Sequence, residues 1–481
     1  MRRLLLSNLK VRVVKRYNYK NVLEIALAVS RIFYLGGIHM TTSLQQYFLQ
    51  HWHDFDDLLR FKTIAAQNIG IQETSDWIVN QFKQLGADRV EKWQDQGGNP
   101  VIFANFTGHN DKTVLFYNHY DTQPAEPLDQ WDTKPFEPTV KDDVLYARGA
   151  DDDKGELIFR LTLIKYYQEH GGLPINIKFY VEGEEEIGSS HVVKYTNAHK
   201  SDLQADAVIW EGGAKNAQGQ LAITGGLRGI SCIELSVATA NADLHSSKAS
   251  YAESAPWRLT KALASLRDDT TGRILIDGIY DDVDELSSAE QELIANLSFD
   301  PEKVAKAEGL TRPLLTKTPK RDLSNEPTIN IEGITAGYQD EGVKTVLPRF
   351  ASAKLDFRLA PSQDPTRIPE LVQKQLIKNG FEDVKVKYLV GQPGYRSDVT
   401  HPFVKLVSQT AKQVYGNDGV EYVPNSFGAG PAYAFGRLLK LPVLGFGIGN
   451  ANSRAHGANE NIRLADAVQA TSLLDQVLQQ F

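Results

Sequence analysis

The chain has 481 residues, of which 42% are hydrophobic and 23% charged, and its formal net charge is −8. That length exceeds what one hydrophobic core usually holds, so we expect two domains. The single cysteine, Cys232, excludes a disulfide framework and a cysteine-rich zinc site, and it favours a cytoplasmic location. The acidic balance argues against a nucleic-acid partner.

The first 39 residues differ from the rest of the chain in charge. They carry eight Lys or Arg and one acid, a net charge of +7, which leaves −15 for the remainder. Their apolar run, 22–35, is interrupted by Glu24 and Arg31 and is shorter than the roughly 20 apolar residues of a transmembrane helix. Its end, Phe33-Tyr34-Leu35-Gly36-Gly37, matches the small-residue cleavage site of a signal peptide poorly. We interpret residues 1–39 as an upstream extension, with translation starting at Met40; a membrane-surface or targeting role is the alternative.

From about residue 43 the spacing of apolar residues predicts alternating helices and strands. Two amphipathic helices come first, over 43–67 and 72–85. A strand at 113–118, a helix at 153–170 and strands at 175–181 and 207–210 are expected next. This alternation is typical of helices that flank a largely parallel sheet, in which ligands bind beyond the carboxyl ends of the strands.

The pattern changes near Gly225 and changes back after Gly394. Between them we expect strands at 230–239, 328–334 and 350–359, and helices at 254–267 and 367–379. Afterwards a helix at 402–415, a strand at 442–447 and a helix at 464–480 are expected. The sequence therefore predicts a first domain in two parts, 40–224 and 395–481, with an α+β domain, 225–394, inserted between them.

Acidic and histidine clusters lie just after the predicted strands. The first is Asn118-His119-Tyr120-Asp121, in which His119 and Asp121 lie on one side of an extended chain. A carboxylate two residues from a histidine can hold the second ring nitrogen and fix the tautomer that binds metal. Taken alone, His-x-Asp is common and usually belongs to a surface loop.

Four further clusters strengthen this signal: Arg148-Gly149-Ala150-Asp151-Asp152-Asp153-Lys154-Gly155, Glu182-Gly183-Glu184-Glu185-Glu186-Ile187-Gly188-Ser189, Trp210-Glu211-Gly212-Gly213 and Ala455-His456-Gly457-Ala458-Asn459-Glu460. Helix capping would account for one of the three aspartates, and a solvated surface would account for an ordinary run of acids. The glutamates instead follow an apolar strand directly, where their repulsion calls for nearby cations. Histidine and carboxylate are the ligands of zinc or manganese when cysteine is absent. Two ions that share a carboxylate can activate a water molecule and polarise a carbonyl, and a further carboxylate can carry the proton.

These motifs resemble those of the dinuclear zinc metallopeptidases of the carnosine dipeptidase, aminoacylase and glutamate carboxypeptidase type. The resemblance covers residues 43–481, because His-x-Asp, Arg-Gly-x-x-Asp-Asp-Lys-Gly, Glu-Gly-x-Glu-Glu-x-Gly-Ser and a late histidine occur in the family's order and spacing. It implies an α/β fold with a mixed, largely parallel sheet flanked by helices. It also implies an inserted α+β lid domain through which two chains form a homodimer.

The resemblance implies two divalent metal ions per chain, zinc first, with manganese or cobalt as alternatives. One ion would be held by His119, Asp152 and Glu211, and the other by Asp152, Glu186 and His456. Asp152 would therefore bridge the two ions. In the family the peptide bond after this aspartate is cis.

The resemblance also implies roles in catalysis and substrate binding. Glu185 resembles the general base, and Asp121 would orient the first metal histidine. His245 would reach the partner subunit's site and stabilise the oxyanion. Arg358 would bind the substrate carboxylate, and Thr345 would contact the substrate. Without the resemblance, His245 could be a surface histidine and Arg358 a charge at a strand edge.

One stretch departs from the family pattern. Many dipeptidase relatives have Gly-Ser-Ile-Pro before the last metal histidine, whereas this chain has Gly428-Ala429-Gly430-Pro431. The serine is absent, although the backbone amides of Gly428, Ala429 and Gly430 remain available to a substrate. The departure leaves the particular dipeptide open.

The predicted function is metal-dependent hydrolysis of the amide bond of dipeptides or other short peptides with a free carboxylate. An N-acyl-amino-acid deacylase or a carboxypeptidase with the same site is the nearest alternative. A binding protein that had lost catalysis would lack a ligand or the base, and none is missing here. A single-metal or structural metal site is the remaining rival. The expected partners are a small peptide or acyl-amino-acid substrate and a second copy of the chain, with neither nucleic acid nor membrane.

Overall fold

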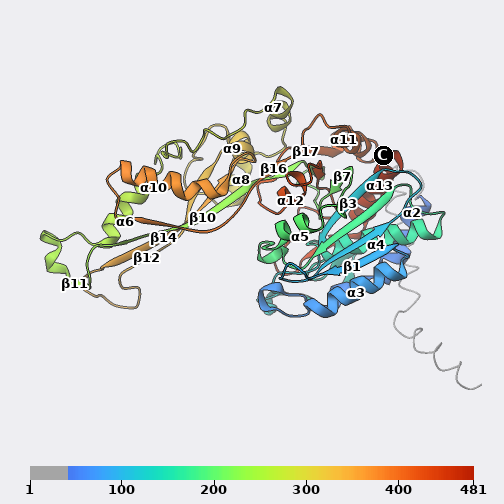
Figure 1. The fold of residues 1–481 in the computed structure, drawn as a ribbon, viewed down its shortest axis with the longest axis horizontal. Coiled ribbons are helices and arrows are strands. Elements are labelled where there is room, and N and C mark those ends of the chain that lie inside the picture. The colour runs from blue at the N-terminus through green and yellow to red at the C-terminus, as the bar shows by residue number, and fades with distance from the viewer. Residues whose placement is uncertain (1–41) are drawn as a thin grey trace, which may run out of the picture.

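Two β-sheets, one in each domain, organise the fold (Figure 1). The structure is a computed structural model that describes residues 42–481. Our interpretation of residues 1–39 and of Met40 therefore lies outside the described residues. Among the residues described, no helix is long and apolar enough to cross a membrane.

The first domain, which the family resemblance implies is the catalytic one, is built on a six-stranded sheet with the order β1-β2-β6-β3-β7-β18. β3 pairs in parallel with β6 and β7, and β18 is parallel to β7, whereas β1 and β2 run antiparallel. Almost every residue of β3 is buried, as expected for a strand covered on both faces. The strands are β1 (Arg89–Trp93), β2 (Val101–Phe106), β3 (Thr113–His119), β6 (Asn176–Glu182), β7 (Ala207–Ile209) and β18 (Val443–Leu444).

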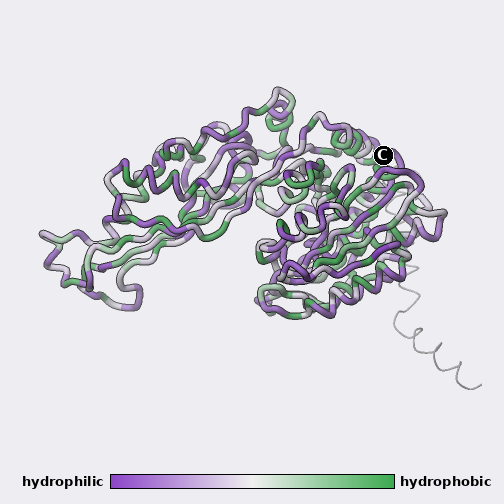
Figure 2. The backbone as a smooth tube through the Cα atoms, in the orientation of Figure 1, coloured by the Kyte–Doolittle hydropathy of each residue, from purple (hydrophilic) through white to green (hydrophobic). Residues whose placement is uncertain are grey.

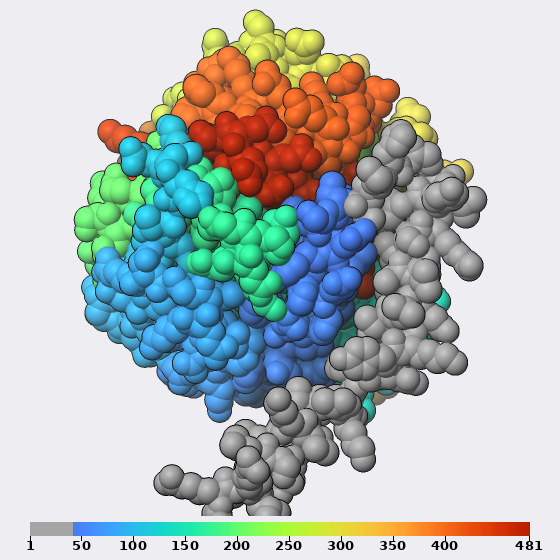
Figure 3. Space-filling model, turned by 90° about the vertical axis from the view of Figure 1, so that its right-hand side faces the viewer, coloured from blue at the N-terminus to red at the C-terminus, as the bar shows by residue number. Residues whose placement is uncertain are grey.

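Helices cover both faces of this sheet. One hydrophobic cluster joins it to α2 (Ser43–His51), α3 (Ile71–Gln84), α4 (Lys154–Glu169), α11 (Pro402–Tyr415) and α13 (Leu464–Gln480). A second cluster on the opposite face includes α5 (Val192–Ala198) and α12 (Tyr433–Gly436). The first and last helices described lie together, since Gln45 donates to Ser472 at 3.4 Å. Figure 3 shows the blue and red ends of the described chain meeting on one face.

The lid domain is built on a four-stranded antiparallel sheet with the order β12-β14-β10-β15. Burial alternates along β10 and β14, so one face packs on helices and the other stays more open. Figure 2 shows hydrophilic and hydrophobic residues mixed along the lid strands. The strands are β10 (Gly229–Ala238), β12 (Thr328–Ala336), β14 (Phe350–Leu359) and β15 (Lys385–Gln392), and α6 (Ala255–Ala264) and α10 (Ile368–Lys378) cover them. Three further helices complete the lid, α7 (Ser288–Ala295), α8 (Pro301–Ala307) and α9 (Pro319–Asn325).

The chain enters and leaves the lid at one place. β9 (Gly226–Leu227) precedes the lid sheet, β16 (Tyr395–Arg396) follows it, and the two pair antiparallel. A Cβ atom added to Gly229 would lie 2.9 Å from the nitrogen of Gly394. Glycine is therefore required where the two crossings touch.

Shorter strands pair in the rest of the fold. β8 (Leu221–Thr224) is parallel to β17 (Val420–Val423). β5 (Val144–Tyr146) lies between β4 (Thr139–Lys141) and β19 (Asn461–Arg463). β11 (Leu244–His245) pairs with β13 (Val346–Leu347).

The structure confirms the predicted α/β fold class with its inserted α+β lid, and most predicted elements agree with it to within a few residues. The helix predicted over 43–67 is wrong beyond His51. There the backbone leaves the α region at His51 and Phe55, and three short 3₁₀ helices follow, at Trp52–Asp54, Asp56–Arg60 and Ala65–Gln67. Leu58 and Leu59 are buried, so burial rather than helix periodicity set the apolar spacing of this segment.

Candidate metal centre

Three parallel strands bring the first clusters to one edge of the catalytic sheet. β3 lies between β6 and β7, and His119, its last residue, stands opposite Glu182. Glu186 comes four residues after the end of β6, and Glu211 two residues after the end of β7. Because the carboxyl ends of parallel strands meet at one edge, both carboxylates flank His119.

Asp152 enters this edge from the loop that leads into α4. The peptide bond between Asp152 and Asp153 is cis, as the family resemblance implied. Asp153 points away from the centre, where its Oδ2 accepts hydrogen bonds from the side chain of Asn118 at 2.7 Å and the backbone of His119 at 3.0 Å. The loop thereby leaves the carboxylate of Asp152 free to face the two histidines.

Asp152 lies between His119 and His456. Its Oδ1 is 2.8 Å from Nε2 of His119, and its Oδ2 is 2.9 Å from Nε2 of His456. Nε2 of His456 is also 3.2 Å from Oε2 of Glu186, and Nε2 of His119 is 3.8 Å from Oε2 of Glu211. The structure thus brings all five predicted ligands together, with one carboxylate oxygen of Asp152 on each side.

The donor set fits divalent cations. Asp152, Glu186 and His456 each offer a ligand atom within 4.8 Å of the others. Oε1 of Glu211 accepts from Nε1 of Trp210 at 2.9 Å, but its Oε2 is buried without a hydrogen bond to any described residue. A buried carboxylate oxygen without a partner is costly, and a metal ion would satisfy it.

The pKa values of the two histidines report the same strong negative potential. Burial alone would lower the pKa of His119, but hydrogen bonds with Asp121 and Asp152 raise it well above its ordinary value. Hydrogen bonds with Asp152 and Glu186 raise the pKa of His456 to about 10. Carboxylates that hold protons on two histidines this firmly also attract metal cations.

Asp121 supports both His119 and the glutamate turn. Nδ1 of His119 lies 3.1 Å from the main-chain oxygen of Asp121 and 3.4 Å from its Oδ1. The carboxylate of Asp121 accepts from the backbone N–H groups of Glu185 at 3.3 Å and Glu186 at 3.1 Å. One buried side chain therefore fixes a candidate ligand and the turn that carries the candidate base.

Glu185 lies beside the metal candidates and next to the glycine-rich segment 428–430. Burial, and the negative charge of Asp152 and Glu186, raise its pKa to about 7, although His119 opposes the shift. A Cβ atom added to Gly430 would lie 3.9 Å from Oε1 of Glu185. Gly430 of this segment therefore lies beside Glu185.

Arg358 faces the catalytic domain from the lid. It pairs with Ile230, which pairs in turn with Gln392, and residues paired in this way project from the same face of a sheet. The Gln392 side chain donates to the main-chain oxygen of Gly188, in the turn after Glu186, at 2.7 Å. Arg358 is half-buried, and its guanidinium makes no hydrogen bond or ion pair with the described residues. An arginine without a partner in this position can receive an anion.

His245 and Thr345 do not join the site of their own chain. β11, which ends at His245, pairs with β13, which begins directly after Thr345, and both residues are exposed. β11 lies at the end of the lid farthest from the catalytic sheet (Figure 1). Both residues therefore lie far from the metal centre of their own chain in this structure.

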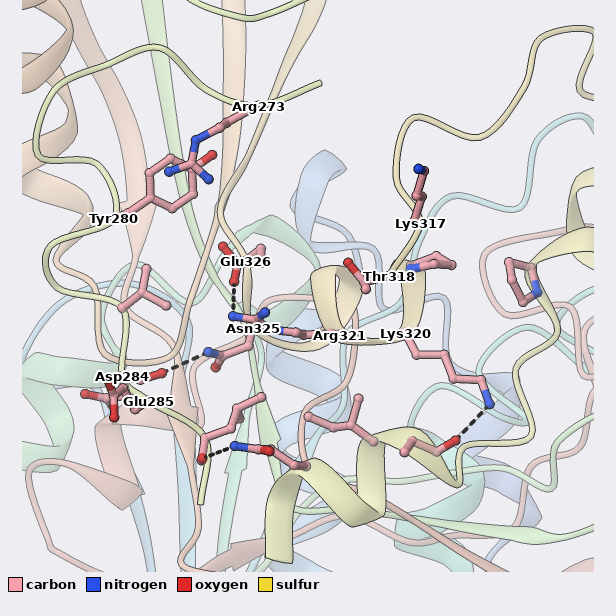
Figure 4. A pocket seen from close by; sticks show the side chains of 17 residues that line it. Arg273, Tyr280, Asp284, Glu285, Lys317, Thr318, Lys320, Arg321, Asn325 and Glu326 are labelled. Atoms are coloured by element: carbon pink, nitrogen blue, oxygen red, sulfur yellow. Dashed lines mark hydrogen bonds and ion pairs between the residues drawn. The ribbon is translucent and has the colours of Figure 1, made fainter. Parts of the chain in front are cut away.

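A cavity of about 870 Å³ opens in the lid between α7, α8 and α9 (Figure 4). Lys317, Arg321 and Glu326 are among its lining residues, but none of the predicted site residues is. Arg321 is paired with Glu326 at 3.0 Å. This cavity is therefore separate from the metal centre.

The sequence analysis gave no role to three residues that support the centre. Trp210 binds the candidate ligand Glu211, and its position directly before that acid was the available signal. Arg148 and Glu460 form a buried pair at 2.6 Å. Both belong to quoted motifs, but a separation of 312 positions in the sequence hides their contact.

Residues 115–480 match the family described as Peptidase family M20/M25/M40. Cys-Gly metallodipeptidase dug1 of Schizosaccharomyces pombe is 29% identical over 430 residues, covering 84% of this chain and 89% of that protein. Human Beta-Ala-His dipeptidase is 26% identical over 431 residues, covering 87% and 83%. The crystal structure of the M20 family metallo-carboxypeptidase Sso-CP2 of Sulfolobus solfataricus has a TM-score of 0.81 at 35% identity, covering 89% of this chain and 98% of that one. The chain therefore belongs to peptidase family M20/M25/M40.

Proposed function

We propose that the chain is a metal-dependent dipeptidase that hydrolyses short peptides with a free carboxylate. The observation that carries the proposal is the carboxylate of Asp152, which offers one oxygen beside His119 and the other beside His456. This arrangement suits two ions that share one ligand. The similarity to proteins named as dipeptidases supports the choice of substrate.

His119, Asp152 and Glu211 would hold one ion, and Asp152, Glu186 and His456 the other. Zinc suits this set of nitrogen and oxygen donors, and manganese and cobalt are the alternatives. When bound, two such ions polarise the substrate carbonyl and lower the pKa of the attacking water.

Glu185 is the proposed general base. It lies beside the ligands without belonging to either set of three, and its raised pKa of about 7 suits a group that takes and returns a proton near neutral pH. It would accept the proton of the attacking water and pass it to the leaving amine. Asp121 would hold the His119 ring and the turn that carries Glu185 in fixed positions during this transfer.

Arg358 is the proposed carboxylate-binding residue. It shares a cross-strand row with Gln392, which contacts the turn that follows Glu186, and its guanidinium has no partner among the described residues. A fork of N–H donors matches the two oxygens of a carboxylate. Backbone groups of Gly428, Ala429 and Gly430 would line the opposite side of the substrate, beside Glu185.

The active unit is proposed to be a homodimer formed through the lid. His245 and Thr345 are exposed at the far end of the lid, where a partner chain could receive them. Exposed apolar residues of the two edge strands, Ile331 and Ile334 on β12 and Val390 on β15, would suit such an interface. A cytoplasmic location is proposed from the single cysteine alone.

A carboxypeptidase is the second candidate. It is favoured by the 35% identity to a metallo-carboxypeptidase, because a substrate that is cleaved at its carboxyl end also presents a free carboxylate to Arg358. An N-acyl-amino-acid deacylase would need the same ions, base and arginine. The three activities differ only in what lies on the amino side of the cleaved bond.

The deciding experiment is a substrate panel assayed with metal-free protein to which zinc, manganese or cobalt is returned. The panel contains free dipeptides, the same dipeptides N-acetylated or C-amidated, and longer peptides. Metal-dependent cleavage of free dipeptides alone would support the dipeptidase. Release of single C-terminal residues from longer peptides would favour the carboxypeptidase, and cleavage of N-acyl compounds alone the deacylase. If none of the substrates is cleaved, the proposal is contradicted.

A further inference from the structure

A buried ion pair lies directly behind the metal candidates. Nη1 of Arg148 donates to Oε2 of Glu460 at 2.6 Å, and the two side chains are only 2% and 1% exposed. Arg148 precedes the loop that carries Asp152, and Glu460 follows the loop that carries His456. The loss of hydration offsets much of the attraction within a buried pair, so the pair alone explains little stability. Its other contacts indicate what it does.

Glu460 collects four hydrogen bonds on one carboxylate. Besides Arg148, the backbone N–H groups of Gly149, Asp151 and Asp152 donate to it, each at 3.0 Å. A carboxylate only accepts and has about four lone-pair sites, so it can satisfy four donors. Successive backbone N–H groups that point at one anion form an anion-binding nest. Glu460 is the anion in this nest, and it fixes the backbone of the residue proposed to bridge the ions.

Arg148 holds the opposite loop. Its Nη2 donates to the main-chain oxygens of His456 at 3.2 Å and Pro124 at 3.1 Å. The backbone of His456 has a φ of +62°, a left-handed conformation that is unfavourable for a residue other than glycine. Surrounding contacts have to maintain such a conformation. The bond from Arg148 to the carbonyl of His456 is one of these contacts.

We propose that Arg148 and Glu460 are a positioning pair that sets the distance between the Asp152 carboxylate and the His456 ring before any ion binds. The inference rests on the proposed function for the identity of the ligands. The two partners act differently. Glu460 holds Asp152, which both ions would share, whereas the second arm of Arg148, Nη2, holds the main-chain oxygens of His456 and Pro124 rather than Asp152. Loss of Glu460 should therefore weaken the binding of both ions, whereas loss of that arm should weaken the binding of only one.

The test is a titration of metal-free protein with Co²⁺. Calorimetry and the visible absorption of the bound ion measure the binding. Wild-type protein should bind two ions. In E460Q the amide NH₂ faces N–H donors, so both affinities should fall by about 10–100-fold, as for other residues that hold metal ligands. R148K keeps the charge beside Glu460 but lacks the second donor arm. R148K should bind one ion with an affinity reduced by a similar factor and the other ion with wild-type affinity.

R228K is the matched control. Arg228 is also 2% exposed, but it donates to lid carbonyls, including those of Leu323 at 2.9 Å and Leu359 at 3.2 Å. This variant should bind Co²⁺ as the wild type does. Thermal unfolding of the metal-free proteins identifies variants that do not fold. If E460Q does not fold, the Co²⁺ affinities of R148K alone test the proposal.

Folded R148K that binds both ions with wild-type affinity would overturn the proposal, and so would R148K that loses both ions equally. A wild-type chain that binds fewer than two ions would overturn the proposal together with the proposed function. A wild-type chain that binds two ions but cleaves no peptide would contradict the proposed function alone. In that case the loss of one ion in R148K would still establish the positioning pair.

Discussion

Nε2 of His456 lies 2.9 Å from Oδ2 of Asp152, although the two residues are 304 positions apart in the chain. The same aspartate is 2.8 Å from His119 through its other oxygen. We expect D152N to lose both ions, because the amide carries no charge and one of its two ends cannot accept a metal. H456N should lose only one. Metal content after dialysis, measured by elemental analysis, would distinguish them, and two ions retained in D152N would contradict the bridging role.

Replacement of Glu185 should separate catalysis from metal binding. E185Q keeps the shape of the side chain but cannot take a proton, so kcat should fall by roughly 10²–10⁴-fold while both ions stay bound. Activity and metal content are measured on the same preparation. E184Q is the matched control, because Glu184 accepts from Asn99 and lies 2.8 Å from His191, away from the proposed chemistry. Near-normal turnover in E185Q would remove Glu185 as the base.

The position of His245 predicts that each active site is shared between two chains. E185Q and H245N should each be nearly inactive on their own. In a mixed dimer, one site combines the intact Glu185 of one chain with the intact His245 of the other, so activity should return to as much as about one quarter of the wild-type value after random subunit exchange. Activity that stays at the level of the two separate variants, although mixed dimers are detected by mass spectrometry, would contradict a role for His245 across the interface.

Glu182 predicts a pH dependence of stability. Burial raises its pKa to about 8, although Tyr117 donates to it at 2.6 Å and Ser189 at 3.0 Å. The folded chain therefore binds a proton that the unfolded chain releases near pH 4.5, so this group destabilises the fold progressively as the pH rises from 4.5 to about 8. E182Q retains an acceptor for both hydroxyls without the titration. The quantity to compare is the free energy of unfolding of E182Q minus that of the wild type. This difference should be larger near pH 8 than near pH 5 by about 1–3 kcal/mol.

Chemical denaturation at both pH values, with metal present throughout, measures this difference. Equal differences at the two pH values would show that Glu182 does not titrate in this range.

The local motifs predicted His119, Glu186 and Glu211 because each lies at the end of a strand or a few residues after it. His119, Glu186 and Glu211 are brought together by β3, β6 and β7, and the order of these strands follows from ordinary parallel packing. The contact between Arg148 and Glu460 has no such local signal. It depends on where two distant loops cross, which residue spacing does not encode.

Other elements escaped prediction for different physical reasons. β15 is an edge strand whose residues are mostly exposed, and the alternation of its charged and apolar side chains stops after Tyr388. The helices α7, α8 and α9 have seven or eight residues each, too few for a helical period to stand out. The exposed position of His245 depends on the whole length of the lid, which no local pattern contains.

The contact of Gly229 with Gly394 makes the lid a removable unit. Because the chain enters and leaves it at one point, the two ends of the catalytic domain could be joined there by a short turn without stretching the backbone. The same geometry allows the lid to be expressed alone or exchanged for a lid of another length. Substrate range and subunit pairing could therefore diverge in evolution without disturbance of the metal-binding edge.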